Sequence, residues 1–147
     1  MTPVTRSDVV ACARRWIGTP YVERQRLRGV GVDCVGLLIG VARDLGFMPS
    51  DFDVPAYTGM PDGVSLVRQC DLYMDRIGNR ELIPGDVAVI VVDKAPQHLG
   101  IITPYRHGGN AIIHATNSHG IRKVIEVRLV WNNAQRFKLG YSFRGVV

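Results

Sequence analysis

The stretch that decides the fold is GVGVDCVGLLIGVA, which runs from Gly29 to Ala42. A glycine-rich turn leads to Asp33, and an almost wholly apolar run follows it. An aspartate placed before a helix accepts hydrogen bonds from the free N–H groups of the first turn, so a helix is expected from Cys34 to Leu45. Gly46 suits the position that closes such a helix. Because it has few charged residues, the helix is expected to be buried almost all round.

Cys34 stands in the first turn of that helix, where the partial positive charge of the N-terminus favours a thiolate. A reactive group on a rigid, buried helix is how a nucleophile is held. The alternative is a core cysteine that happens to begin a helix, and this stretch alone does not separate the two. Gly36 and Gly40 are four residues apart and therefore share a helix face, where another element is expected to approach closely.

The composition is that of an ordinary globular domain. The chain has 147 residues, of which 46% are hydrophobic and 21% are charged, so a single domain is expected over residues 1–147. The formal net charge of +5 favours an anionic partner. The Lys and Arg residues form no long run, which argues against nucleic acid. No apolar run approaches the roughly 18 residues that span a bilayer, so no membrane insertion is expected.

The three cysteines, Cys12, Cys34 and Cys70, cannot all pair within one chain, and no Cys-x-x-Cys spacing is present. Neither a disulfide framework nor a metal motif is expected, and we predict no cofactor. The N-terminus lacks the apolar stretch of a signal peptide. Synthesis in the cytoplasm is therefore expected, with another route to any target outside the cell.

Helices are predicted in the first half of the chain and strands in the second. A first helix, capped by Ser7 or Asp8, is expected to run to about residue 17, and a third is expected over residues 64–77. Cys12 and Cys70 fall on the inward faces of these helices. Apolar and alternating runs predict strands at 87–92, 99–103, 111–115, 123–130 and 140–146. The class is α+β, with N-terminal helices packed on a central antiparallel sheet.

One strand alternates cleanly enough to assign its faces. In the run over 123–130, Ile125, Val127 and Leu129 are expected to face inward, with charged residues between them facing out.

Two histidines fall at strand ends and suggest a catalytic set with Cys34. His98 opens the strand at 99–103 and His114 ends the strand at 111–115. An antiparallel register that pairs even-numbered residues with even-numbered residues places both histidines on one sheet face. Gly100 is then expected to face His114 and leave space above the sheet. A helix packed on that face, with Cys34 at its tip, completes a Cys-His-His set.

Other interpretations of these residues stay open. Each histidine alone fits a satisfied strand-end residue, and Cys34, His98 and His114 together fit a zinc site that lacks a paired ligand motif. His107 and His119 lie in turns and are left out of the site. The loop that carries Arg24, Arg26 and Arg28 is either a solvated loop or a set of cations that meets substrate carboxylates.

Five motifs follow one another along the chain: Gly18-Thr19-Pro20-Tyr21, Asp33-Cys34-Val35-Gly36-Leu37, Pro84-Gly85-Asp86, His98-Leu99-Gly100-Ile101 and Ile113-His114-Ala115. In this order they resemble the motifs of the NlpC-type cell-wall peptidases, which are small papain-like cysteine peptidases. The resemblance extends over nearly the whole chain. Pro61-Asp62-Gly63 and the Phe143-Arg144 ending resemble the branch found in phage tails and gene-transfer particles.

The resemblance implies a papain-like, NlpC-type α+β fold and hydrolysis of peptidoglycan stem peptides. In that family the usual bond joins the side-chain carboxyl of D-glutamate to a diamino acid. By position, Cys34 is the nucleophile, His98 the base and His114 the residue that orients it. The candidate oxyanion- or substrate-binding residues are Tyr21, Asp33, Arg24, Arg26 and Arg28. Two features depart from many members: Val35 replaces a serine, and three arginines replace a short glycine-rich loop.

Two rival functions and a route of delivery complete these expectations. The first rival is a structural tail or baseplate component that keeps the fold without useful activity. The second is a thiol acyltransferase or amidase that uses the same residues on another substrate. Because peptidoglycan lies outside the cytoplasmic membrane, the resemblance implies delivery within a phage-like tail and contact with other tail proteins.

Overall fold

The computed structural model describes residues 2–54, 64–92, 95–118, 120–131 and 135–147. Its helices and strands, in chain order, are α1 (Arg6–Arg14), β1 (Arg26–Leu27), β2 (Gly31–Val32), α2 (Cys34–Asp44), α3 (Ser65–Tyr73), β3 (Met74–Arg76), β4 (Val87–Val92), β5 (Ala95–Pro104), β6 (Asn110–Ser118), β7 (Ile121–Arg128) and β8 (Gln135–Phe143). His119 and the Pro61-Asp62-Gly63 motif lie outside the described residues.

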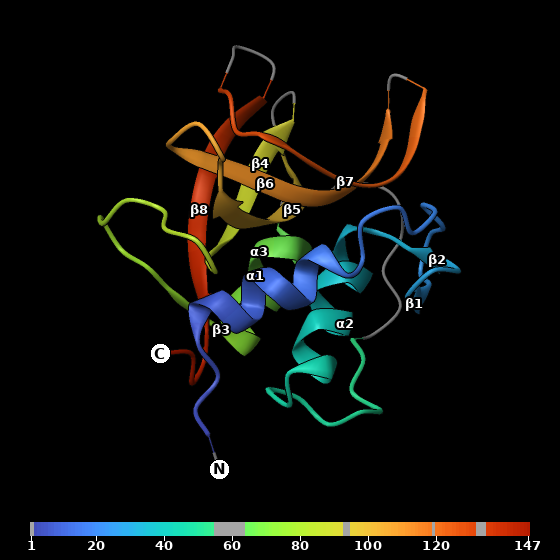
Figure 1. The fold of residues 1–147 in the computed structure, drawn as a ribbon, viewed down its shortest axis with the longest axis horizontal. Helices are drawn as coiled ribbons and strands as arrows, with labels where there is room; N and C mark the ends of the chain where they lie inside the picture. The colour runs from blue at the N-terminus through green and yellow to red at the C-terminus, as the bar shows by residue number, and fades with distance from the viewer. Residues whose placement is uncertain (1, 55–63, 93–94, 119, 132–134) are drawn as a thin grey trace.

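Six strands form one antiparallel sheet in the order β3-β8-β4-β5-β6-β7, and β1 and β2 form a separate small hairpin. The three helices lie together on one side of the large sheet (Figure 1). The predicted α+β class, with helices packed on an antiparallel sheet, is confirmed. The charged segment that was predicted to be a plain loop contains β1, which pairs with β2 immediately before α2.

The first helix begins two or three residues earlier than predicted, and it ends at Arg14 and not near residue 17. Thr5 is its N-cap: the Thr5 hydroxyl accepts a hydrogen bond from the Asp8 N–H, and the Asp8 carboxylate accepts one from the Thr5 N–H. This reciprocal capping box satisfies two N–H groups at once, so neither Ser7 nor Asp8 is the cap. After the helix ends, the ring of Trp16 packs on Gly40 of α2 so closely that a Cβ at Gly40 would lie 2.2 Å from it. The predicted close approach to the glycine face of α2 is confirmed.

The third helix is shorter than predicted because its last residues join the sheet. It ends at Tyr73, and Met74 adopts an extended backbone and pairs with Phe143 in β8. Pairing with β8 buries Met74 in the core. The helical spacing of apolar residues continued past Tyr73, but tertiary hydrogen bonding to β8 outweighed it.

The main core lies between the helices and the sheet. It includes Leu37 and Val41 from α2, with Leu99, Ile101 and Ile113 from β5 and β6. Cys12 and Cys70 are both buried in this core, as predicted. The opposite face of the sheet carries a smaller cluster formed by Ala88, Ile90, Ile102 and Ile112.

The face assignment of β7 was wrong. Val124 is fully buried in the main core, whereas Val127 is 40% exposed. Leu129 packs instead against the smaller cluster on the other side of the sheet. Val124 pairs with Ala115 of β6, which also lies in the main core, so the even-numbered residue takes the core face and the odd-numbered apolar residues take the other face.

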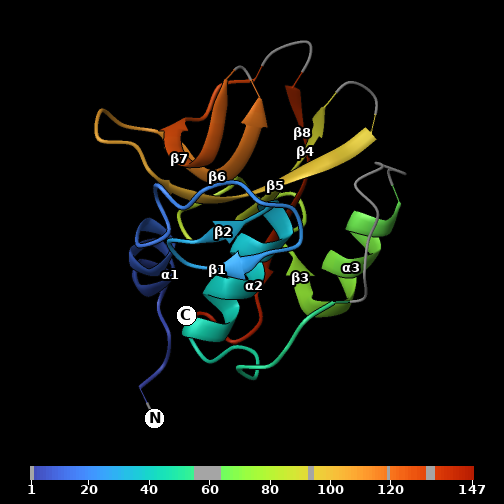
Figure 2. The same ribbon diagram turned by 90° about the vertical axis from the view of Figure 1, so that its right-hand side faces the viewer.

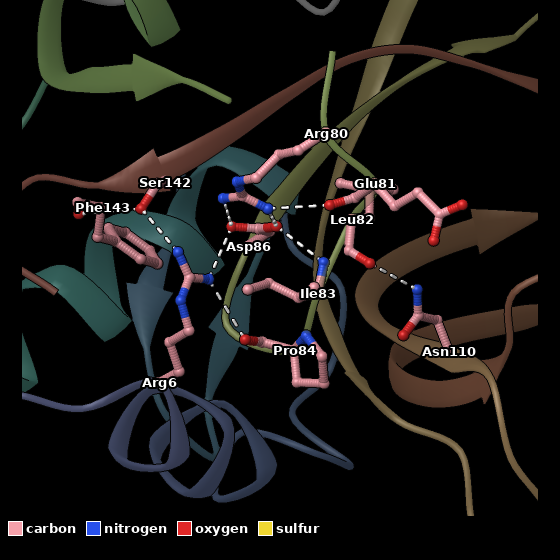
Figure 3. A network of polar contacts seen from close by, with 10 residues as sticks. All are labelled: Arg6, Arg80, Glu81, Leu82, Ile83, Pro84, Asp86, Asn110, Ser142 and Phe143. Carbon is pink, nitrogen blue, oxygen red and sulfur yellow. Dashed lines mark hydrogen bonds and ion pairs between the residues drawn. The ribbon is translucent and has the colours of Figure 1, made fainter. Parts of the chain in front are cut away.

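A buried carboxylate ties the N-terminal helix to the sheet (Figure 3). Asp86 is fully buried and accepts hydrogen bonds from Arg6 at 2.7 Å, from Arg80 at 2.7 and 2.9 Å, and from the Ile83 N–H at 2.9 Å. Burial by itself raises the pKa of Asp86, but the bonds from Arg80, Ile83 and Arg6 lower it below its usual value. Gly85 before it has φ +93°, which only glycine adopts readily, so the Pro84-Gly85-Asp86 turn delivers this carboxylate.

We expect Asp86→Asn to lower the free energy of unfolding by about 2 to 4 kcal/mol, because it removes the buried charge that both arginines share. The folded pKa of Asp86 is lowered, so its contribution is present at neutral pH and is lost as the pH falls below about 4. Chemical denaturation at neutral pH measures the difference. Asp75→Asn is the matched control, since the Asp75–Arg144 pair is exposed. Equal effects of the two substitutions would contradict this assignment.

Candidate active site

The N-terminus of α2 is built as the sequence predicted. Asp33 is the N-cap, and its Oδ1 accepts a hydrogen bond from the Gly36 N–H at 2.7 Å. The helix ends at Asp44, with Leu45 as the C-cap and Gly46 at φ +76°. Cys34 is therefore the first residue of a helix that is buried along most of its length.

His98 of β5 and His114 of β6 meet side by side. Nε2 of His98 lies 2.6 Å from Nδ1 of His114, and the ring centroids are 4.8 Å apart. The prediction that the two imidazoles share one face is confirmed. If Nε2 of His98 carries the proton of this hydrogen bond, its Nδ1 is left with a lone pair. That lone pair is the one able to accept a proton from a neighbouring thiol.

The helix does not pack on the sheet face that was predicted. Helix α2 packs on the sheet face that carries Leu99 and Ile101. His98, which pairs with Ile90, lies on the opposite face by the alternation of the strand. The predicted space above Gly100 is also wrong, since a Cβ built there would lie 2.4 Å from Cδ1 of Ile112. The even-numbered register was right, but it could not tell which face the helices cover.

Strands β5 and β6 separate next to the histidines. Pairing between these strands stops at Ile101 and Ile113, although both strands continue (Figure 2). The Ile102 N–H bonds to the carbonyl of Asp86, toward β4, so by alternation the Leu99 N–H points the other way, into the split. This N–H lowers the pKa of the Cys34 thiol. The Cys34 thiol is therefore influenced by the residue that follows His98. Whether His98 accepts the thiol proton stays a prediction.

The electrostatics favour a neutral thiol and a neutral imidazole at rest. Burial, followed by the charge of Asp33, raises the pKa of Cys34 to about 11, although the N–H groups of Leu99, Val35 and Cys34 lower it. Burial lowers the pKa of His98 to about 3, with a contribution from the charge of His114, and burial lowers the pKa of His114 to about 4. The N–H groups at the N-terminus of α2 lower the pKa of Cys34, as predicted, but burial raises this pKa by more.

Tyr21 lies in the electrostatic environment of the thiol. Its backbone forms a β-bridge with Val32, immediately before Asp33. Burial raises the pKa of Tyr21 to about 12, and the charges of Cys34, Asp33 and Glu23 act in the same direction. The hydroxyl therefore keeps its proton at neutral pH and is able to donate a hydrogen bond.

The three arginines before α2 have different surroundings. Arg26 is engaged by two carboxylates, Asp53 and Asp33. Arg24 is exposed, and its backbone has φ +62° while its N–H donates to Oδ2 of Asp33 at 2.7 Å. Arg28 is exposed, and its charge acts on Cys12 in α1. The role of these arginines in substrate binding stays a prediction.

Sequence reasoning missed the Leu99 N–H and the contacts of Arg26. The first is a backbone group, which no residue type identifies. The second depends on Asp53, which lies beyond the end of α2. Within the described residues, no three His, Cys, Asp or Glu side chains are grouped so that they could hold a metal ion. No helix in that part of the chain is long and apolar enough to cross a membrane.

The other two cysteines are expected to be structural. Burial, with the charge of Asp44, raises the pKa of Cys12 to about 11, and burial, with the charges of Asp71 and Cys34, raises that of Cys70 to about 12. We predict that Cys12→Ala and Cys70→Ala each lower the free energy of unfolding by about 1 to 2 kcal/mol and leave turnover intact. Thermal melts and turnover assays on the same samples check this. Lost turnover with an unchanged melting temperature would reverse the conclusion.

Comparison with known proteins identifies the fold. No protein-family model and no curated protein matches the sequence. Among solved structures, the crystal structure of the NlpC/p60 domain of peptidoglycan hydrolase SagA matches with a TM-score of 0.59. The alignment covers 95% of this chain and 100% of that domain at 22% sequence identity. The chain has the NlpC-type fold. At this level of identity the likeness is one of fold, and the chemistry must be argued from the site.

Proposed function

We propose that the protein is a cysteine peptidase that hydrolyses peptide bonds of peptidoglycan stem peptides. The observation that carries this proposal is the position of Cys34 at the N-terminus of α2, where the N–H of Leu99 lowers the pKa of the thiol. Leu99 directly follows His98, which is hydrogen-bonded to His114. A thiol, a neutral base and a group that orients the base are what nucleophilic acyl transfer requires. The solved structure with the same fold is described as a peptidoglycan hydrolase, which supports the choice of substrate.

The reaction is an acyl transfer in two halves. The Cys34 thiol gives its proton to Nδ1 of His98 as the sulfur attacks the carbonyl carbon, and His98 then protonates the leaving amine. This leaves a thioester. Water attacks the thioester with His98 as base, releasing a carboxylic acid and the free thiol. The N–H of Cys34 has no partner within the helix and, with the Tyr21 hydroxyl, is the proposed donor to the oxyanion.

Incubation with purified muropeptides, followed by mass analysis of the products, tests the substrate class. The expected result is a pair of fragments that together weigh one water more than the parent peptide. A thiol acyltransferase would instead move the acyl group to an added amine. A degenerate structural protein would give no product, and its Cys34 would react with a thiol-directed electrophile no faster than Cys12 or Cys70.

We also propose that the protein works in a phage-like tail, at the bacterial cell wall. The support is the order of its sequence motifs, which resembles the tail and gene-transfer branch of the family. The proposed partners are other tail or baseplate proteins. Mass spectrometry of purified particles tests the proposal. If the chain is present in the cytoplasm of the producing cells but is never found in the purified particles, delivery by the tail is ruled out.

A further inference from the structure

Arg26 joins the helix that carries the nucleophile to the loop that follows the same helix. Its side chain is only 8% exposed. The Nε atom donates to Oδ1 of Asp53 at 2.7 Å, and Nη1 lies 3.6 Å from Oδ1 of Asp33. A nearly buried guanidinium between two carboxylates is held in a fixed place, unlike an arginine on a solvated loop.

Asp33 has two opposing effects on the site. Its Oδ1 caps α2 through the Gly36 N–H, and its Oδ2 holds the Arg24 N–H, so it fixes the position of Cys34. The Asp33 carboxylate is buried and belongs to the residue directly before Cys34. Its negative charge disfavours a second negative charge on the Cys34 sulfur. The cap that places the nucleophile therefore also opposes its ionisation.

We propose that Arg26 is a positioning residue for Cys34: its guanidinium holds the Asp33 carboxylate and balances its charge, so that the sulfur anion formed in catalysis does not face an uncompensated carboxylate. This inference rests on the proposed role of Cys34 as nucleophile. It gives one of the three arginines of this hairpin an electrostatic role, in place of contact with substrate.

Four other titratable groups of this region carry no charge at neutral pH. Tyr21 and Cys70 are neutral at neutral pH because burial raises their pKa values to about 12. His98 and His114 are neutral because burial lowers theirs. On the far side of Arg26, Asp53 is also 3.8 Å from Arg43, so this second carboxylate is shared between two cations. The ion pair of Arg26 with Asp33 supplies a positive charge beside the carboxylate that precedes Cys34.

The test measures the rate at which iodoacetamide alkylates Cys34, as a function of pH, by mass spectrometry of the Cys34 peptide in the intact protein. We expect Arg26→Gln to raise the midpoint pH by about half a unit to one unit and to slow alkylation near neutral pH by about three- to tenfold. Arg26→Lys should recover part of the rate. Arg106→Gln removes an equal charge from an exposed turn and should leave the profile unchanged.

A double-mutant cycle separates the electrostatic role from a structural one. Asn is as good a cap as Asp, so Asp33→Asn removes the charge and keeps the helix N-terminus. In that background Arg26→Gln should no longer shift the midpoint. A melting temperature that falls without any shift of the profile would overturn the proposal. Because alkylation needs no peptidoglycan, a protein that fails on muropeptides but shows the shift would contradict the proposed function alone.

Discussion

Cys34→Ser is expected to abolish hydrolysis of peptidoglycan peptides, with a loss of at least about 10,000-fold in turnover. A serine hydroxyl has nearly the size of the thiol but a much higher pKa, and the neutral His98 that we propose as its base is a weak base. Burial already raises the pKa of the thiol to about 11. A site that disfavours ionisation of the thiol would not ionise a serine hydroxyl, which is a poorer nucleophile. Product formation from muropeptides, followed by mass spectrometry, measures the loss.

The matched control is Cys12→Ser, which makes the same atomic change at a buried cysteine of α1. It should lower the melting temperature and keep turnover. The Cys34→Ser protein should melt close to the wild type, because Cys34 is only partly buried and its place in the helix is set by the Asp33 cap. Full activity of Cys34→Ser would show that the nucleophile is another group.

Local features of the sequence were enough to predict the helix of the nucleophile. Asp33, Cys34 and Gly46 each act on the backbone within a few residues, and all three have the predicted positions. The pairing of His98 with His114 was also predictable, because it follows from counting residues across one hairpin. These predictions depend on contacts close in sequence or on the alternation of a strand.

Features set by distant packing could not be predicted in this way. The sheet face that α2 covers depends on how six strands bury two unequal clusters. The end of α3 depends on β8, about seventy residues further along the chain. Arg26 looked like a loop cation because its partner Asp53 follows α2, and no local pattern links the two. The sequence pattern identified which residues carry the chemistry more reliably than it identified how they are held.

His98 and His114 are expected to differ in importance although they touch. His98→Ala should reduce turnover about 1,000-fold, because it removes the base that takes the thiol proton. His114→Ala should reduce it only about 10- to 100-fold, because a neighbour that orients the base contributes less than the base itself. Turnover on muropeptides, measured for each variant at the same pH, checks both values.

Two further variants show whether His114 acts through its hydrogen bond. His114→Gln should lose less activity than His114→Ala, since its amide oxygen is able to accept the hydrogen bond that an Nε2 proton of His98 donates across the 2.6 Å contact. His107→Ala, in the exposed turn between β5 and β6, should have no effect. If His114→Ala were as inactive as His98→Ala and the glutamine variant restored nothing, His114 would itself be a proton-transfer group, and the assignment of the base to His98 alone would be wrong.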